Sequence, residues 1–153
     1  MLLTGSYRRT LDEKLRLAIP KQLRDAIGFS ELENSLFITP GTDKSLAIYT
    51  APVLEALGEN LAQNSPAAKD TRHFSRLFYA QAQPADVDRQ GRLRIPPELA
   101  QLASITSEVI VLGVRDHIEL WDAAAWMEFL TATQPRYDEL AESVLRGSPD
   151  INT

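Results

Sequence analysis

The most distinctive chemistry in this sequence is an aspartate followed four residues later by an arginine. The pattern occurs twice, as Asp12 with Arg16 and as Asp88 with Arg92. Aspartate favours tight turns because its carboxylate accepts hydrogen bonds from nearby backbone amides. The arginine guanidinium matches phosphate, and the O6 and N7 atoms of guanine, in a bidentate geometry. For the aspartates, a structural turn with an ion pair and a functional role both remain open, whereas for the arginines we favour a role in binding.

Further basic residues flank both arginines. Lys14 precedes Arg16, and Arg89 and Arg94 lie on either side of Arg92. Because the pattern recurs, we expect two donor-rich loops at equivalent places in the fold, suited to binding phosphate.

The charge is divided unevenly along the chain. The 153 residues carry a formal net charge of −5, which taken alone argues against a nucleic-acid partner. However, residues 1–24 sum to +4 and residues 69–94 to +3, which leaves −12 for the rest. A phosphate responds mainly to charges within a Debye length of about 10 Å. The local windows therefore matter more than the average, and the acidic total does not exclude DNA.

The residues give little support to enzyme chemistry. The carboxylates near the two elements have no accompanying histidine or third type of ligand, so we interpret them as turn caps and solvated charges. The two histidines, His73 and His117, show no metal-ligand spacing, and the sequence contains no cysteine. Neither a nucleophile elbow nor a phosphate-binding glycine loop is present. We therefore predict no catalytic residues, no metal and no cofactor, and expect neither an enzyme nor a small-molecule substrate.

The two elements belong to a longer internal repeat. Residues 11–23 align with residues 87–99 at an offset of 76, with six of thirteen positions identical. The likeness continues downstream into two short apolar stretches and a helical stretch in each copy. Because a unit of about 50 residues buries little core alone, we expect the two units to pack together or exchange strands.

Each copy predicts the same succession of elements. Pro20 and Pro96 end a strand and begin a helix, Gly28 is placed to end the first helix, and Thr50 to begin a later one. The predicted strands cover 16–19, 36–39, 46–50, 92–95, 109–114 and 117–121, and the predicted helices 21–27, 51–61, 97–103 and 123–130.

A central segment separates the two copies. Residues 63–69 are polar and predict a linker, while the spacing of Phe74, Leu77 and Phe78 predicts a helix over 70–82 whose apolar face packs against the protein. We prefer that packing role to an aromatic and basic surface for nucleic acid. The expected divisions are a first unit over 5–62, linker and central helix over 63–80, a second unit over 81–131, and a C-terminal helix with a frayed tail over 132–153.

The general composition is that of a globular protein. Hydrophobic residues make up 44% and charged residues 24%, which is ordinary for such proteins. No apolar run approaches the ~20 residues of a membrane helix, and the N-terminus lacks the pattern of a secretory signal. We therefore expect a cytoplasmic protein without a membrane partner.

The ordered set of motifs resembles the MraZ family. The likeness extends in order to about residue 130, and it includes both aspartate–arginine elements. The segments that carry it are Gly5-Ser-Tyr7, Thr10-Leu-Asp-Glu-Lys-Leu-Arg-Leu-Ala-Ile-Pro20, Phe74-Ser-Arg-Leu-Phe-Tyr-Ala80, Asp88-Arg-Gln-Gly-Arg-Leu-Arg-Ile-Pro-Pro97 and Ile118-Glu-Leu-Trp-Asp122.

This resemblance implies a mainly β fold with helices (α+β), in which two tandem SpoVT-AbrB-like swapped-hairpin units form a small pseudo-symmetric β-barrel. It implies a bacterial transcriptional regulator, located in the cytoplasm at the nucleoid and assembled as a ring-shaped homo-oligomer. Such a protein would bind short, repeated G-rich sites on double-stranded DNA upstream of the division and cell-wall gene cluster, commonly repressing that cluster and its own gene.

Carried over by motif position, the implied DNA contacts are Lys14, Arg16, Arg89, Arg92 and Arg94, with Asp12 and Asp88 as structural turn residues. One position departs from the family pattern. The family usually has glycine before the first-repeat arginine, where this chain has Leu15, whereas Gly91 is retained in the second repeat. A positive φ at Leu15 would be strained, so we expect the first loop to differ in geometry or affinity.

The main rival interpretation is an antitoxin-like or scaffold protein that uses the same fold to grip a protein partner. An antitoxin ordinarily needs a long C-terminal arm, for which the helical second unit and short tail leave little room.

Overall fold

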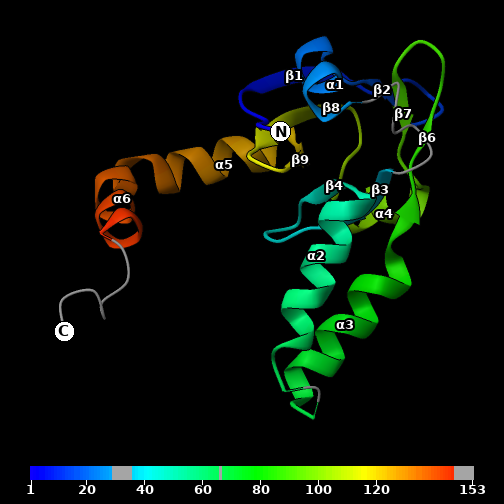
Figure 1. The fold of residues 1–153 in the computed structure, drawn as a ribbon. Coiled ribbons are helices and arrows are strands. Elements are labelled where there is room, and N and C mark those ends of the chain that lie inside the picture. The colour runs from blue at the N-terminus through cyan, green and yellow to red at the C-terminus, as the bar shows by residue number, and fades with distance from the viewer. Residues whose placement is uncertain (29–35, 66, 147–153) are drawn as a thin grey trace. The chain divides into compact units, whose positions relative to one another are not determined.

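The structure is a computed structural model that describes residues 1–28, 36–65 and 67–146 (Figure 1). Its contacts divide the chain into two compact units, one over Met1–Asp122 and one from Ala123 onwards. The larger unit contains every described strand. The predicted frayed tail after residue 146 and position 66 of the predicted linker lie outside the described residues.

The larger unit contains a six-stranded antiparallel sheet. Its strands, in spatial order, are β1 (Ser6–Thr10), β8 (Glu108–Val114), β9 (His117–Asp122), β4 (Leu46–Thr50), β3 (Leu36–Pro40) and β5 (Gln83–Pro84). Strands from the two sequence repeats meet in its centre, where β4 pairs with β9. Strands of the two repeats also pair at one edge of the sheet, where β1 lies beside β8.

A second antiparallel sheet carries the two aspartate–arginine elements. It consists of β2 (Arg16–Ala18), β7 (Arg92–Arg94) and β6 (Asp86–Val87), with β7 in the middle. Leu17 and Leu93 stand opposite each other in the β2–β7 ladder and are almost fully buried. Because neighbouring residues on a strand face opposite sides, this burial directs the arginines of both strands to the other face.

The registers reveal a two-fold relation between the repeats. Leu17 and Leu93 are equivalent in the repeat and pair with each other, so that Arg16 stands opposite Arg94 and Ala18 opposite Arg92. The backbone bonds follow the same exchange: the Ile19 amide donates to the Gly91 carbonyl at 3.2 Å, and the Ile95 amide to the Leu15 carbonyl at 2.9 Å. The large sheet shows the same symmetry, because β1, β3 and β4 of the first repeat correspond to β5, β8 and β9 of the second. When equivalent strands are exchanged, the order β1-β8-β9-β4-β3-β5 is the same read from either end.

Two short helices follow the strands of the small sheet. Helix α1 (Lys21–Ile27) begins after Pro20, and helix α4 (Pro97–Leu102) begins after Pro96. Proline suits this place because its φ is already helical and it has no amide to leave unsatisfied. Gly28 ends α1 with a left-handed φ of 71°, which confirms its predicted role as a C-cap.

Two longer helices complete the larger unit. Helix α2 (Ala51–Ala62) begins at Thr50, whose side chain accepts a hydrogen bond from the Val53 amide at 3.4 Å, as predicted for an N-cap. Helix α3 (Lys69–Gln81) contacts α2 where Gly58 leaves room for the Tyr79 hydroxyl. A side chain at position 58 would meet that hydroxyl at 2.7 Å.

The core joins residues from both repeats. Its members are aliphatic side chains from the two sheets and the two short helices, among them Leu17, Leu23, Ile95, Leu99 and Val111. A core built in this way stabilises neither repeat without the other, as the small size of each unit predicts.

The second unit is helical. It contains α5 (Ala123–Thr133), a 3-10 turn over Gln134–Arg136 and α6 (Tyr137–Leu145). The rings of Trp126 and Phe129 stack with their centroids 5.3 Å apart. None of the described helices is long and apolar enough to cross a membrane.

The predicted elements are confirmed with shifts of up to three residues at their ends, and the mixed α+β class with antiparallel sheets is confirmed. The described ladders form two sheets and do not close into a barrel, so barrel closure stays a prediction. The expected divisions of the chain also stay predictions. One expectation was wrong: of the apolar face on α3, only Phe78 is buried, while Phe74 and Leu77 are 44% and 65% exposed.

Candidate nucleic-acid interface

The two aspartates hold their turns in the same way. The Asp12 carboxylate accepts hydrogen bonds from the backbone amides of Lys14 and Arg16, both at 2.9 Å, and from the Arg16 Nε at 2.8 Å. The Asp88 carboxylate accepts the corresponding bonds from Gln90 at 2.9 Å, and from the Arg92 amide and Nε at 3.0 and 2.7 Å. Each aspartate thus fixes both the turn and one edge of the guanidinium.

These bonds keep both carboxylates ionised. The pKa of Asp12 lies below its ordinary value, chiefly because the Arg16 amide donates to the charged form, and the pKa of Asp88 is lowered in the same way by Arg92. Hydrogen bonds to a carboxylate favour its charged form. Around neutral pH each aspartate is therefore an acceptor, and no described residue binds the two terminal nitrogens of its arginine.

The turns require a left-handed residue immediately before each arginine. Leu15 has a φ of 61° and Gly91 a φ of 79°. Leucine in this region is strained by roughly 1 kcal/mol or more, because its Cβ crowds the following carbonyl. Leu15 is half-buried against the apolar core, and that contact offsets part of the strain. The first turn therefore keeps the geometry of the second despite the change of residue.

The antiparallel pairing of β2 with β7 brings the two turns to one hollow. The hollow has a volume of about 530 Å³, and its lining combines four cations with two carboxylates: Lys14, Arg16, Arg92 and Arg94 with Asp86 and Asp88. The side chains of Arg16 and Arg92 are 30% and 34% exposed. An excess of cations on a partly shielded surface attracts phosphate more strongly than separated charges in water do.

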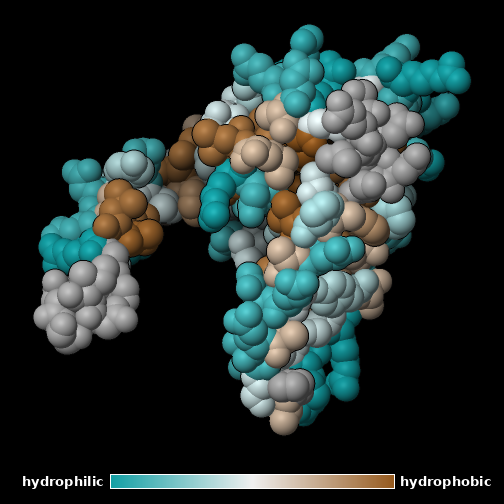
Figure 2. All heavy atoms as spheres, viewed as in Figure 1, coloured by the Kyte–Doolittle hydropathy of each residue, from teal (hydrophilic) through white to brown (hydrophobic). Residues whose placement is uncertain are grey.

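Four of the five residues predicted to contact DNA line this hollow, and Arg89 does not. Arg89 is exposed in the turn between β6 and β7. Figure 2 shows hydrophilic side chains at this end of the β6–β7 hairpin. Arg89 therefore extends the basic surface along the hairpin.

Two further residues lie at the interface that the sequence did not predict there. Asp86 stands opposite Arg94 in the β6–β7 register and lines the hollow, but its first-repeat equivalent is Thr10, so the repeat gave no signal. Arg24 in α1 lies against Gly91, whereas the sequence alone indicated only that Arg24 belongs to a basic window. The missing information was the pairing of β6 with β7 for Asp86 and the pairing of β2 with β7 for Arg24.

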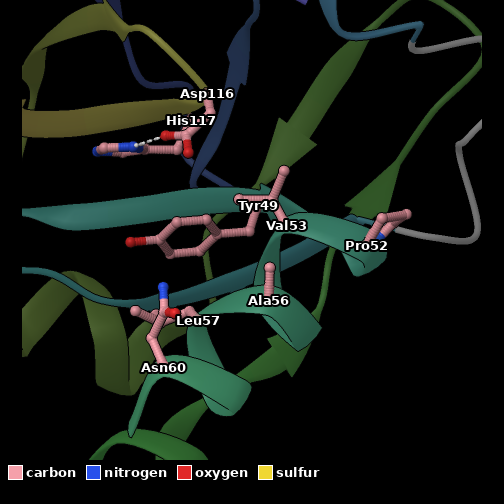
Figure 3. A pocket seen from close by; sticks show the side chains of 8 residues that line it. All are labelled: Tyr49, Pro52, Val53, Ala56, Leu57, Asn60, Asp116 and His117. Carbon is pink, nitrogen blue, oxygen red and sulfur yellow. Dashed lines mark hydrogen bonds and ion pairs between the residues drawn. The ribbon is translucent and has the colours of Figure 1, made fainter. Parts of the chain in front are cut away.

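A second hollow lies between β4, α2 and the turn before β9 (Figure 3). Its volume is about 370 Å³. Apolar side chains of α2 form much of its lining, and four residues add polar groups: Tyr49, Asn60, Asp116 and His117. The ring of Tyr49 lies against that of His117, with the centroids 5.1 Å apart. The lining includes no cysteine or serine that could act as a nucleophile.

His117 is held between two carboxylates. Its Nδ1 lies 3.0 Å from an oxygen of Asp116, and its Nε2 lies 2.9 Å from an oxygen of Glu119. Both ring nitrogens donate only when the imidazole is protonated, so these bonds, led by that of Glu119, raise the pKa of His117. The bond with His117 also lowers the pKa of Glu119. This arrangement anchors the start of β9. Among the residues described, no three or more histidine, cysteine, aspartate or glutamate side chains are arranged so that they could hold a metal ion.

Comparison with known proteins places both repeats in one family. The family model described as "MraZ protein, putative antitoxin-like" matches twice, over residues 2–77 and 78–146. A protein of Frankia alni named "Transcriptional regulator MraZ" is 36% identical over 143 residues, which cover 94% of this chain and 96% of the relative.

Two further relatives with the same name give similar values. That of Lactiplantibacillus plantarum is 36% identical over 141 residues, covering 92% of this chain and 96% of its own length. That of Clavibacter michiganensis subsp. michiganensis is 34% identical over 143 residues, covering 94% and 96%. The family model and these relatives span nearly the whole chain, and the chain belongs to the MraZ family.

Proposed function

We propose that this chain is a sequence-specific regulator of transcription that binds double-stranded DNA through its two aspartate–arginine turns. The observation that carries the proposal is the hollow lined by residues of the two turns and of β2, β6 and β7, where the pairing of β2 with β7 brings cations of both repeats together. Membership of a family whose relatives are named transcriptional regulators supports it. Such regulators are not a class of enzyme.

The chemistry of the two arginines suits DNA. Because Asp12 and Asp88 engage the Nε atoms, the terminal nitrogens of Arg16 and Arg92 remain for a ligand. A guanidinium fixed at one edge loses less entropy when it binds, and two terminal N–H groups can contact guanine O6 and N7 together. Lys14, Arg89 and Arg94 add phosphate contacts. We therefore propose short G-rich repeats as the target sites.

We propose that the protein acts as a ring-shaped homo-oligomer, in which the two sheets of each chain belong to a small pseudo-symmetric barrel. One chain offers few phosphate contacts, and repeated chains facing repeated DNA sites gain avidity. An exposed apolar face on α6 supports this assembly, since Tyr137, Leu140 and Val144 recur at helical spacing and are 62%, 36% and 73% exposed. Figure 2 shows hydrophobic side chains at α6.

The proposed target is the bacterial division and cell-wall gene cluster, with the gene of this protein included and repression as the outcome. The protein would act in the cytoplasm, at the nucleoid. This part rests on the family, whereas the contact residues rest on the geometry of the turns.

The alternative is an antitoxin-like or scaffold protein that binds a protein partner. The family description, which includes the words antitoxin-like, and the exposed Phe74 and Leu77 on α3 favour it. This function would use the apolar faces and leave the arginine turns dispensable.

A gel-shift titration tests the proposal. The probe is a labelled duplex from upstream of the reading frame of this chain, compared with a mixed-sequence duplex of equal length. The wild type should prefer the upstream duplex, and an Arg16→Ala/Arg92→Ala double variant should lose the complex. Arg76→Ala, on exposed α3, is the control for loss of a cation and should bind normally. Undiminished binding by the double variant would refute the assignment of the site.

A further inference from the structure

The two turns differ in what covers their left-handed residue. In the first turn the covering group is the Leu15 side chain, which packs against the apolar core. In the second turn Gly91 has no side chain, yet it is buried. The repeat therefore preserves the backbone, while a different residue occupies the space beside Gly91.

That residue is Arg24 of α1, which comes from the other repeat. A Cβ at position 91 would lie 2.9 Å from Arg24 Cδ, 3.0 Å from Cζ and 2.8 Å from Nη1. The outer half of the Arg24 side chain thus passes directly over the Gly91 Cα. Glycine is required here on two grounds, the positive φ and this close approach.

The position of the guanidinium is fixed by a backbone bond. The Arg24 Nε donates to the Ile19 carbonyl at 3.0 Å, and the Ile19 amide in turn donates to the Gly91 carbonyl at 3.2 Å. No hydrogen bond or ion pair joins the terminal nitrogens of Arg24 to other residues in the described ranges. A cation is therefore held against the second turn, and no described residue binds its two terminal nitrogens.

The first turn has no counterpart. The residue equivalent to Arg24 is Ala100, which is 4% exposed and belongs to the apolar core against which Leu15 packs. The pair Leu15 with Ala100 therefore replaces the pair Gly91 with Arg24. The exchange makes the first turn apolar at this point and the second turn cationic.

We propose that Arg24 is a further DNA-contacting residue, which binds a backbone phosphate beside the second turn and has no equivalent at the first. This inference rests on the proposed function. It deepens that function, because it makes the two turns chemically unequal: both contribute an aspartate-anchored arginine, and the second adds a cation from α1.

Phosphate is the favoured ligand because the Arg24 guanidinium extends only a short way from the protein surface. Its Nε is tethered to the protein backbone, so the guanidinium lies close to the surface of the turn. The base edges lie at the floor of a groove about 8.5 Å deep, whereas the phosphates form its rim. A cation held close to the protein meets the rim first, and phosphate contacts fix orientation without reading sequence.

Two variants of the full chain test the role of Arg24. Arg24→Met keeps an unbranched side chain over Gly91 but removes the charge. Arg24→Lys keeps a positive charge but lacks the planar guanidinium. Affinity is measured by fluorescence anisotropy with the upstream duplex and with the mixed-sequence duplex, between about 50 and 200 mM salt. Thermal unfolding of each variant reports whether the fold is retained, and Arg76→Met is the matched control.

Loss of one phosphate contact should lower affinity roughly eightfold near 0.1 M salt, and should make the slope of log K against log salt shallower by about 0.9 for each chain bound. Arg24→Met should show this loss equally on both duplexes, and Arg24→Lys should retain most of the affinity. Wild-type affinity and slope in a folded Arg24→Met would overturn the inference and leave the proposed function standing.

Three other outcomes also decide. If Arg24→Met fails to fold, Arg24→Gln, which also removes the charge, decides: a slope shallower by about 0.9 supports the inference, and a wild-type slope overturns it. A loss by Arg24→Met confined to the upstream duplex would indicate base recognition and overturn the phosphate assignment. No salt-dependent binding by the wild type would overturn both the inference and the proposed function.

Discussion

Replacing Gly91 with alanine is expected to disturb both the second turn and the side chain that covers it. The new Cβ would sit at a φ of 79°, where an L-residue costs roughly 1–2 kcal/mol. It would also lie 2.8–3.0 Å from three atoms of Arg24. Those atoms belong to the end of a flexible side chain, so we expect Arg24 to move and the turn to stay.

The expected destabilisation is about 2 kcal/mol. Displacing Arg24 breaks its hydrogen bond to the Ile19 carbonyl, which contributes about 1 kcal/mol. The smaller conformational freedom of unfolded alanine returns roughly 0.5 kcal/mol. For a chain of this length 1 kcal/mol corresponds to roughly 2–4 °C in melting temperature, so thermal unfolding should show a fall of about 4–8 °C.

A double-mutant cycle separates the two causes. In an Arg24→Ala background the hydrogen bond from Arg24 to the Ile19 carbonyl is already absent. Gly91→Ala should then lower the free energy of unfolding only by its backbone strain. The coupling between the two positions should therefore be about 1 kcal/mol. A Gly91→Ala variant as stable as the wild type would refute the strain and the close approach together. Additive effects would refute the contact between Gly91 and Arg24.

Three further predictions concern stability, each measured by urea or thermal unfolding. Leu15→Gly should destabilise by about 1 kcal/mol, because lost apolar contact and greater unfolded freedom outweigh the relief of strain; a gain would contradict this. Because the pKa of His117 is raised in the folded protein, its protonated form stabilises the fold fully below pH 6.5, and this contribution is lost as pH rises through the pKa of the folded state. His117→Gln should therefore flatten the fall in stability with rising pH. The lowered pKa values of Asp12 and Asp88 give stability present above 3.8 and lost as pH falls through the folded values. Asp12→Asn/Asp88→Asn should abolish this acid-side loss, and an unchanged acid profile would count against the turn geometry.

The sequence was most informative where local chemistry decides the structure. Prolines 20 and 96 mark the starts of α1 and α4 because proline fixes φ. The repeated aspartates predicted turns, and both turns are present with matching hydrogen bonds. The expectation of strain at Leu15 came from the family resemblance, since the family usually has glycine at this position, and the φ of Leu15 is indeed positive.

Long-range pairing could not be predicted in detail. The repeat indicated that the units pack or exchange strands, but not that Leu17 and Leu93 form the centre of the β2–β7 ladder. Nor did the repeat indicate the β6–β7 register, which places Asp86 opposite Arg94, or the approach of Arg24 to Gly91. Helical spacing likewise identified the apolar face of α3 but not its exposure, because periodicity does not reveal what covers a face.

The salt dependence of DNA binding tests the central claim most directly. Affinity of the wild type and of the Arg16→Ala/Arg92→Ala variant for the upstream duplex would be measured across a range of salt concentrations. We expect a steep negative slope of log K on log salt for the wild type, with each phosphate contact contributing about 0.9. The folded double variant should bind at least roughly tenfold more weakly, the equivalent of about 1.4 kcal/mol. A slope near zero for the wild type, or equal affinity of the two proteins, would contradict a DNA interface built from the two turns.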